Sequence, residues 1–254
     1  SRAFLDTNGV RQHQIVDVCE NEYDEHPFDA VNSDLNTVLQ DANVASQIGL
    51  AEMFDASIGK STVLMPFGGK YQLTPEEGSV QKLPVHGMTN TCSVMTYGYD
   101  PKVSKYSPYL GASYSVVEAL ARITALGVDY KKCRLSNQEY FERLGADAQK
   151  WGQPFEALLG LIDAQLAFET PSIGGKDSMS GSFNEIDVPP TLVSFAVDVA
   201  KEKDIITPEF KKAGNPIVWF KIAKDAYDLP DYAQMMDLYE TVSYKHLRAN
   251  ETSL

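Results

Sequence analysis

The sequence predicts a mixed α/β protein, because strand-like runs alternate along it with amphipathic helical runs. The strand-like runs are rich in β-branched and aromatic residues and span 79–85, 92–99 and 191–200. The clearest helical run is 111–126, and a second begins near Pro154, each with apolar residues at helical spacing. A chain of 254 residues is long enough to bury one large core or two modest ones.

The elements expected in the first half are a polar lead-in, one helix and three strands. Residues 1–40 are acidic and lack apolar periodicity, so we expect a linker or the tail of a preceding domain there. A helix from Asn43 is expected to bury a face made of Val44, Ile48, Leu50, Ala51 and Phe54. A strand over 62–67, stopped by two glycines, is expected before the strands 79–85 and 92–99.

The second half is expected to alternate helices and strands. The predicted elements are the helix 111–126 with Gly127 as its stop, the strand 134–138, a helix from near Pro154, the strand 191–200, a helical turn over 208–211, the strand 217–222 and the helix 232–242. The residues of the helix after Pro154 that are expected to face the core are Phe155, Leu158, Leu159, Ile162 and Leu166.

The predicted domain organisation follows from where proline and glycine cluster. Asn215 and Pro216 mark a boundary, so residues 41–214 are expected to form the main domain. Residues 215–242 contain one expected strand and one helix, which cannot bury their own apolar faces, and are interpreted as the truncated start of a second domain. Residues 243–254 are polar and without pattern, and are expected to be a tail.

The composition excludes several classes of protein. The formal net charge is −13, whereas nucleic acids and anionic membranes attract proteins with a basic surface. The first residues lack the charged start and apolar core of a signal peptide, and no apolar run is long enough to span a membrane. The three cysteines, Cys19, Cys92 and Cys133, are far apart, as is typical of free thiols in a reducing compartment. We therefore expect a cytoplasmic protein with no nucleic-acid or membrane partner.

The stretch 171–181, P-S-I-G-G-K-D-S-M-S-G, is where we expect the functional site. Glycines such as Gly174 and Gly175 let backbone N–H groups approach a phosphate closely, and Lys176 adds a positive charge. Asp177 supplies the oxygen ligand that a nucleotide-bound Mg²⁺ requires. A plain surface turn is the alternative, because Gly, Asp and Ser also dominate turns for local reasons.

Acidic residues outside this stretch have two interpretations. Glu118 is expected in the middle of a helix, with Arg122 four residues later, so an ion pair along the helix is the simpler interpretation. The functional alternative is that Glu118 is a Mg²⁺ ligand facing Asp177. The acidic residues expected to form a solvated face are Asp129, Glu139, Glu142 and Asp147.

Several long words of the sequence occur together in one known family. They are N-V-A-S at 43–46, T-V-L-M-P-F-G-G-K-Y-Q at 62–72, Q-E-Y-F-E-R-L-G at 138–145, the stretch 171–181, and D-V-P-P-T-L-V-S-F-A at 187–196. On these words, residues 40–242 resemble phosphoribosylformylglycinamidine synthase, the large amidotransferase of purine biosynthesis. The order of the words agrees with that family.

The resemblance implies a fold and an activity. The implied fold is an aminoimidazole-ribonucleotide-synthetase-like N-terminal domain with a β-rich pairing face, followed by the start of a C-terminal α/β domain. The chain is identified as the second of two such modules, which pairs with the first module or with a second copy of itself. The implied enzyme is an ATP-dependent C–N ligase that amidates formylglycinamide ribonucleotide. The chain alone is expected to be inactive, because the glutaminase domain and its Cys nucleophile are absent.

The resemblance also implies an auxiliary site that holds ADP or ATP with Mg²⁺. The residues that it assigns to the nucleotide are Gly174, Gly175, Lys176, Ser178 and Ser180, and those that it assigns to the metal are Asp177, Glu118 and Asn90. Two positions depart from the family, in which Asp stands near Asn90 and Asn near Arg122. An amide brings no charge to Mg²⁺, and a guanidinium replaces a cation beside phosphate rather than binding one. The alternative function is a structural pairing domain with no occupied nucleotide site.

Overall fold

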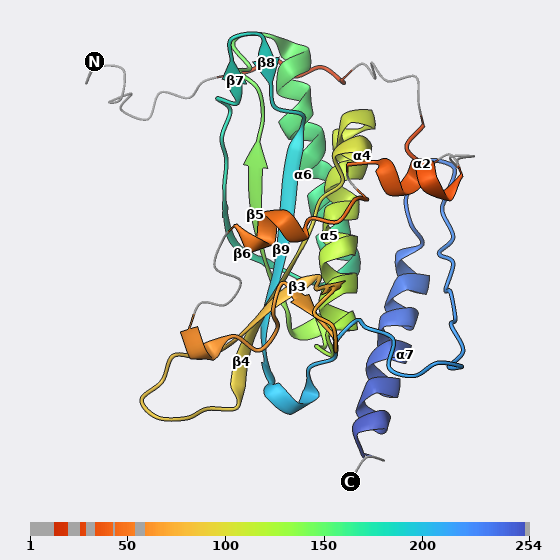
Figure 1. Ribbon diagram of the computed structural model, residues 1–254. Helices are drawn as coiled ribbons and strands as arrows, with labels where there is room; N and C mark the ends of the chain where they lie inside the picture. The colour runs from red at the N-terminus through yellow and green to blue at the C-terminus, as the bar shows by residue number, and fades with distance from the viewer. Residues whose placement is uncertain (1–12, 20–25, 29–33, 43, 54–58, 252–254) are drawn as a thin grey trace.

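The computed structural model describes residues 13–19, 26–28, 34–42, 44–53 and 59–251. In this part of the chain a five-stranded sheet, ordered β3-β4-β9-β5-β6, carries its helices on one face (Figure 1). Its strands are β3 (Gly78–Lys82), β4 (Thr91–Gly98), β5 (Arg134–Tyr140), β6 (Ser172–Lys176) and β9 (Thr191–Lys201). The predicted α/β class and the β-rich middle of the chain are therefore confirmed.

One end of the sheet collects the carboxyl ends of three strands. β5 and β6 pair in parallel, whereas the pairs β3–β4, β4–β9 and β9–β5 are antiparallel. β4, β5 and β6 consequently run in the same direction. We call the edge where they finish the carboxyl end of the sheet, and define it by residues 98–100, 139–141 and 176–178. The helix α6 (Ala148–Phe168) makes the crossover that parallel strands require.

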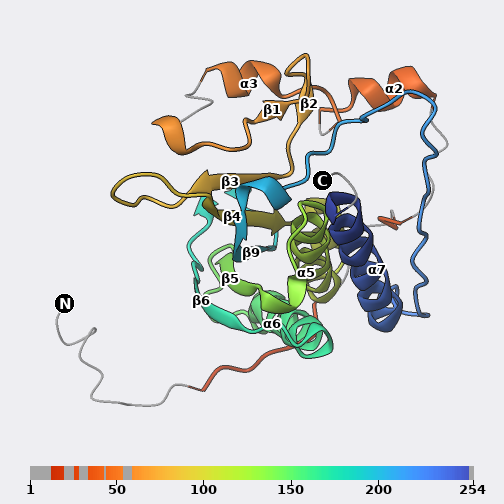
Figure 2. The same cartoon turned by 90° about the horizontal axis from the view of Figure 1, so that it is seen from below.

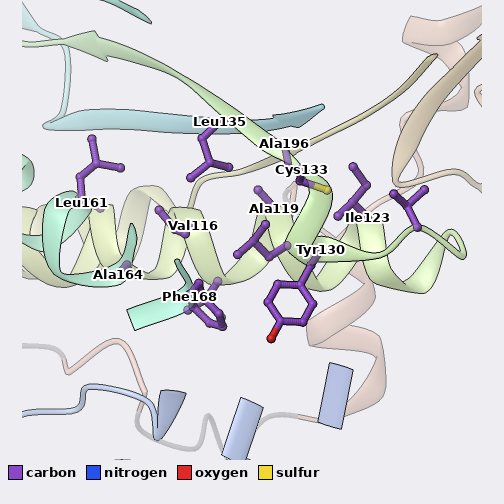
Figure 3. Packing of buried hydrophobic residues seen from close by; sticks show 14 of the residues in the cluster. Val116, Ala119, Ile123, Tyr130, Cys133, Leu135, Leu161, Ala164, Phe168 and Ala196 are labelled. Atoms are coloured by element: carbon purple, nitrogen blue, oxygen red, sulfur yellow. The ribbon is translucent and has the colours of Figure 1, made fainter. Parts of the chain in front are cut away.

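The core lies between the sheet and the helices α5 (Pro108–Ala125) and α6. Figure 3 shows Val116, Ala119 and Ile123 of α5 beneath Leu135 and Ala196 of the sheet, all of them buried. α5 begins where Ser107 Oγ accepts a hydrogen bond from the N–H of Leu110, and Gly127 follows its end with φ of 92°. The predicted helix 111–126 is thus confirmed, with one earlier turn that begins at a proline.

The opposite face of the sheet is not covered by helices (Figure 2). Side chains alternate along β4, so that Cys92 and Val94 are buried toward the helices while Met95 and Tyr97 are 43% and 50% exposed. The uncovered side, called the open face below, carries polar residues at the strand ends and on β5, and its apolar residues are Met95, Tyr97, Tyr140, Val193, Phe195, Val197 and Val199. A surface this apolar is unusual for a protein that works alone.

Helix α6 differs from its prediction in both start and orientation. It begins at Ala148 after the cap Asp147, so Pro154 lies inside it rather than at its start. The predicted core stripe is wrong, because Phe155, Leu158, Leu159, Ile162 and Leu166 are between 42% and 72% exposed. The buried side of α6 instead consists mainly of small residues, namely Gly152, Ala157, Gly160 and Ala164, with Pro154, Leu161 and Phe168. These small residues let α6 approach α5 closely. The side of α6 that carries them therefore faces inward, in place of the side with the large apolar residues.

The first predicted helix and strand are mostly wrong. Asn43 and Phe54 lie outside the described residues, and between them the helix α3 covers only Ile48–Glu52, with Leu50 58% exposed. In the predicted strand 62–67, Thr62 makes an isolated bridge to Gln81, and β1 is limited to Phe67–Gly68. β1 pairs with the equally short β2, Thr74–Pro75. Proline and glycine interrupt the pairing on both strands.

The C-terminal segment also differs from its prediction. Residues 208–211 are not helical, and 217–222 form no strand, because no neighbouring strand in the described chain pairs with them. Helix α7 begins at Tyr232 as predicted but continues to Glu251, so the expected tail is helical up to that residue. Tyr239 of α7 is buried and donates a hydrogen bond to Val117 O of α5. The domain division at residue 214 stays a prediction.

The remaining elements are short. They are α2 (Leu35–Gln40), α4 (Pro101–Tyr106), β7 (Ser182–Phe183), β8 (Ile186–Asp187) and 3-10 turns at Gly59–Ser61, Tyr130–Lys132 and Glu202–Asp204. No helix in the described part of the chain combines the length and the apolar character that a membrane span needs.

The contact between α5 and α6 gives a stability prediction. A Cβ added at Gly160 would lie 2.0 Å from the carbonyl oxygen of Tyr109, so Gly160→Ala must push the two helices apart. Overpacking of this kind costs about 1–3 kcal/mol of unfolding free energy. Urea denaturation is the measurement. Gly49→Ala, in α3 with nothing near its Cβ, is the control and should lose no stability; equal stability of the two variants would contradict the prediction.

Candidate functional site

The Gly-rich stretch is an edge strand rather than a turn. Residues Ser172–Lys176 form β6, which pairs in the described part of the chain with β5 alone, and all five of them are exposed. Pairing continues past the strand, since Ser178 N donates to Glu139 O at 3.0 Å and Phe141 N donates to Ser178 O at 2.8 Å. Gly175 is needed for this pairing, because a Cβ there would lie 2.3 Å from Asn137 O. The turn geometry expected for 171–181 therefore does not occur over β6.

This edge leaves backbone donors unpaired by the sheet. In a parallel ladder, alternate residues direct their N–H and C=O groups to the neighbouring strand. Lys176 stands opposite Gln138 and Ser178 bonds to β5 through both backbone groups, so the even-numbered residues face inward. The N–H groups of Gly175 and Asp177 consequently point outward from the edge. Gly174 has no other atom within 4 Å of the position of a Cβ, which keeps the approach open.

Lys176 and Asp177 point to opposite faces of the sheet. The Nζ of Lys176 lies 4.7 Å from the centre of the Tyr140 ring, and Tyr140 belongs to the open face. The next residue in an extended chain points the other way. Asp177 accordingly lies beside Glu139, which faces the helices. The ammonium expected to lie next to Asp177 is instead on the far side of the strand.

Both carboxylate oxygens of Glu118 already have partners. Oε1 lies 2.7 Å from Nη2 of Arg122, and Oε2 accepts a hydrogen bond of 2.8 Å from the N–H of Tyr99. Arg122 also contacts Glu77 at 2.5 Å and donates to Tyr97 O. Burial raises the pKa of Glu118, although Arg122 and the Tyr99 N–H act in the opposite direction. The ion pair along the helix, the simpler of the two sequence interpretations, is thus confirmed.

The predicted metal ligands lie on different elements. Glu118 and Asp177 both lie at the carboxyl end of the sheet, but β9 and β5 separate β4 from β6. Three strand spacings correspond to about 14 Å between the backbones of β4 and β6, and the shared ligation of one ion by Glu118 and Asp177 stays a prediction. Asn90 precedes β4 at its other end, where its carbonyl accepts from Glu202 N. The length of β4 puts Asn90 about 25 Å from the site.

Glu139 lies beside Asp177 and was not among the predicted site residues. It was expected on a solvated face, yet it is only 3% exposed, so that expectation is wrong. Burial, followed by the charge of Asp177, raises the pKa of Glu139 to about 7. Strand alternation contained the signal, because Leu135, Asn137 and Glu139 share one side of β5 and Leu135 is fully buried.

The remaining predicted residues complete an open surface. The hydroxyl oxygens of Ser178 and Ser180 lie 3.2 Å apart beyond the end of β6. No group of three or more His, Cys, Asp or Glu side chains is arranged to hold a metal among the described residues. A cavity of about 1040 Å³ lies at the N-terminal ends of α5 and α6, lined by residues that include Lys105, Glu142 and Lys150. None of the predicted site residues lines this cavity.

Comparison with known proteins gives a consistent family. The chain is 23% identical over 206 residues to phosphoribosylformylglycinamidine synthase subunit PurL of Pyrobaculum aerophilum. This alignment covers 81% of the chain and 28% of the relative. The chain is 26% identical over 169 residues to the same subunit of Pyrobaculum calidifontis, covering 65% of this chain and 22% of that one. No family model matches the sequence.

A solved structure agrees. Thermotoga maritima PurL complexed with AMPPCP superposes with a TM-score of 0.55 over 92% of this chain and 34% of its own, at 15% identity. This chain is similar to phosphoribosylformylglycinamidine synthase. At 15% identity, this superposition shows a shared fold and carries no information about function. The chain spans 28% and 22% of the lengths of the two Pyrobaculum subunits that it matches.

The raised pKa of Glu139 predicts how stability depends on pH. Its pKa of about 7 in the folded chain exceeds the usual 4.5, so the folded state binds the extra proton between these values. Stability from this group is present below pH 4.5 and is lost as pH rises through 7. Glu139→Gln should therefore gain stability over the parent between pH 5 and pH 8, on the order of 2 kcal/mol after solvent screening.

Urea denaturation in EDTA at a series of pH values measures this effect. Glu185→Gln changes an exposed carboxylate in the β7–β8 turn and is the matched control. Its unfolding free energy should follow the parent at every pH. A constant difference between Glu139→Gln and the parent across the series would show that Glu139 does not titrate with folding.

Proposed function

We propose that this chain is the second aminoimidazole-ribonucleotide-synthetase-like module of a phosphoribosylformylglycinamidine synthase, and that it supplies the auxiliary nucleotide site of that cytoplasmic enzyme. The similarity to the two PurL subunits supports the family. The observation that favours a nucleotide site is the Gly-rich edge strand, whose outward N–H groups at Gly175 and Asp177 lie at the carboxyl end of the sheet. Ligands of α/β sheets bind at that end of the strands.

The ligand at this site would be ADP or ATP. Outward N–H groups on a strand without side chains at Gly174 and Gly175 can donate to phosphate oxygens, and the hydroxyls of Ser178 and Ser180 lie just beyond them. Arg122 holds a fixed positive charge beside Glu118 at the same end of the sheet. A nucleotide lying across the strand ends would span the distance between β6 and β4.

The reaction of the whole enzyme would be the ATP-dependent amidation of formylglycinamide ribonucleotide. Such a ligase converts the amide oxygen into a phosphoryl leaving group before ammonia attacks, so the central requirement is neutralisation of charge around phosphate. Mg²⁺ would supply much of that neutralisation when bound. This chain would contribute positioning and structural support, because its nucleotide site is auxiliary in the proposal.

The glutaminase step would be provided elsewhere in the enzyme. The chain has three cysteines, and all are free thiols. Burial raises the pKa of both Cys19 and Cys133 to about 12, with Glu156 adding to the effect at Cys19 and Asp198 at Cys133. Burial raises the pKa of Cys92 as well. A nucleophilic cysteine needs a lowered pKa, so the isolated chain is not expected to hydrolyse glutamine.

A structural pairing domain without a bound nucleotide is the second candidate. The open face favours it, since Met95, Tyr97 and Val199 present apolar area that a partner could bury. The ion pair of Glu118 with Arg122 also favours it, because the guanidinium already supplies the positive charge that a metal would bring to this carboxylate. Pairing and nucleotide binding are compatible, and the partner is either the first module or a second copy of the chain.

Nucleotide binding is tested by calorimetric titration of ADP in the presence of Mg²⁺. We expect Asp177→Asn to weaken Mg²⁺-dependent ADP binding by about tenfold or more, because one negative ligand of the cation is lost. Glu185→Gln removes an exposed carboxylate from the same chain and should bind like the parent. Unchanged affinity of Asp177→Asn would reject Asp177 as a site residue. No binding by the parent at millimolar ADP and Mg²⁺ would favour the structural candidate.

Pairing is tested by light scattering at tens of micromolar chain. We expect a dimer that buries the open face, because an apolar sheet surface of this kind gains free energy when it is covered. Met95→Lys combined with Val199→Lys should give monomers, since the new charges would be buried. Val85→Lys, an equally exposed loop position away from the sheet, should leave the dimer intact. A monomeric parent would contradict self-pairing.

A further inference from the structure

We propose that Glu139 and Asp177 together bind one divalent cation at the carboxyl end of the sheet. This inference rests on the proposed function, since it names the cation ligands of the same nucleotide site. It differs from the ligand set implied by family resemblance, in which Asp177 acts with Glu118 and Asn90. The evidence comes from strand register, burial and two side chains that lack hydrogen-bond donors.

Register places the two carboxylates side by side. Gln138 stands opposite Lys176 in the parallel pair, and Ser178 N bonds to Glu139 O, so Glu139 and Asp177 are the next positions along the two strands. Backbones of paired strands are about 4.8 Å apart, and residues in step point to the same face. The distance suits two carboxylates that share one cation with oxygen ligands at about 2.1–2.6 Å.

The surroundings of Glu139 create a need for positive charge. Glu139 is 3% exposed, and no group among the described residues donates a hydrogen bond to its carboxylate. The Glu139 oxygens are not among the fully buried atoms that lack a partner, so they remain accessible to an ion at the end of the sheet. The neighbouring Asp177 adds like-charge repulsion. A divalent cation relieves it for both carboxylates at once.

A buried hydrogen-bond acceptor without a partner lies near Glu139. Asn137 lies two residues before Glu139 on the same side of β5 and is 7% exposed. Its Nδ2 donates to Ser172 Oγ, whereas its Oδ1 is buried and has no partner among the described residues. Mg²⁺ usually keeps several bound waters, each of which is a hydrogen-bond donor. A metal-bound water can therefore satisfy Asn137 Oδ1, which otherwise remains unpaired at a cost.

Access and competition also favour this pair of ligands. Gly175 stands opposite Asn137 in the sheet, so β6 contributes no side chain that would close the approach. At the other side of the site, Arg122 forms ion pairs with Glu118 and a second carboxylate. The two carboxylates on the β5–β6 side form no ion pair among the described residues. Mg²⁺ is commonly bound by one or two carboxylates together with phosphate oxygens, which a nucleotide on the β6 edge would add.

Binding of Mn²⁺, a paramagnetic substitute for Mg²⁺, tests the inference by electron paramagnetic resonance. The parent chain with ADP should bind one tightly held Mn²⁺, and Glu139→Gln and Asp177→Asn should each weaken it by about tenfold or more. Glu118→Gln should have a smaller effect than either, because its carboxylate is held by Arg122. Glu185→Gln is the exposed control and should match the parent.

The experiments distinguish a failure of the cation inference from a failure of the proposed nucleotide site. Mn²⁺ affinity unchanged in Glu139→Gln, with a loss in Asp177→Asn, would overturn the role of Glu139 and leave the proposed function standing. No Mn²⁺ binding by the parent at millimolar concentration would overturn the inference, and ADP titration in EDTA then reports separately on the nucleotide site. Urea denaturation of each variant, measured alongside, excludes unfolding as the cause of a loss.

Discussion

The parallel pairing of β5 with β6 is the constraint on which the candidate site depends. Because no described strand pairs with the other side of β6, half of its backbone groups point outward, and two glycines keep side chains away from them. The same pairing aligns Glu139 with Asp177. Beyond the end of β6, the two backbone hydrogen bonds between Ser178 and residues 139 and 141 extend this alignment to Asp177. A loop in the same position would hold none of these groups in step.

The β4 side and the β5–β6 side of the candidate site differ in how their carboxylates are neutralised. Arg122 contacts two carboxylates and the carbonyl of Tyr97, and its guanidinium lies 4.8 Å from the centre of the Tyr97 ring. Arginine stays charged at every physiological pH and keeps a fixed geometry. On the β4 side of the site the permanent positive charge of Arg122 is therefore already paired with two carboxylates, whereas Glu139 and Asp177 form no ion pair among the described residues. The proposed exchangeable cation would act on the β5–β6 side.

Local sequence patterns predicted the fold where tertiary contacts agree with them. The strands of the central sheet and helix α5 were predicted from periodicity, because alternation and apolar spacing match their burial. Helix α6 was predicted in the wrong orientation, since a large apolar stripe is a weaker constraint than close contact through Gly160 and Ala164. In the site, composition identified Asp177 but not Glu139, whose role depends on which strand lies beside it. Strand neighbours are not encoded in local composition.

The exposed apolar side of α6 has a further consequence when it is taken together with the open face. The chain carries one large apolar surface on its sheet layer and another on its helix layer. The chain therefore has two opposite apolar surfaces, whereas a typical monomeric protein has no large apolar patch on its surface. Covering one side leaves the other in water, so a dimer through the open face alone would still expose the apolar residues of α6. Burying both surfaces would take contacts on two opposite sides of the chain.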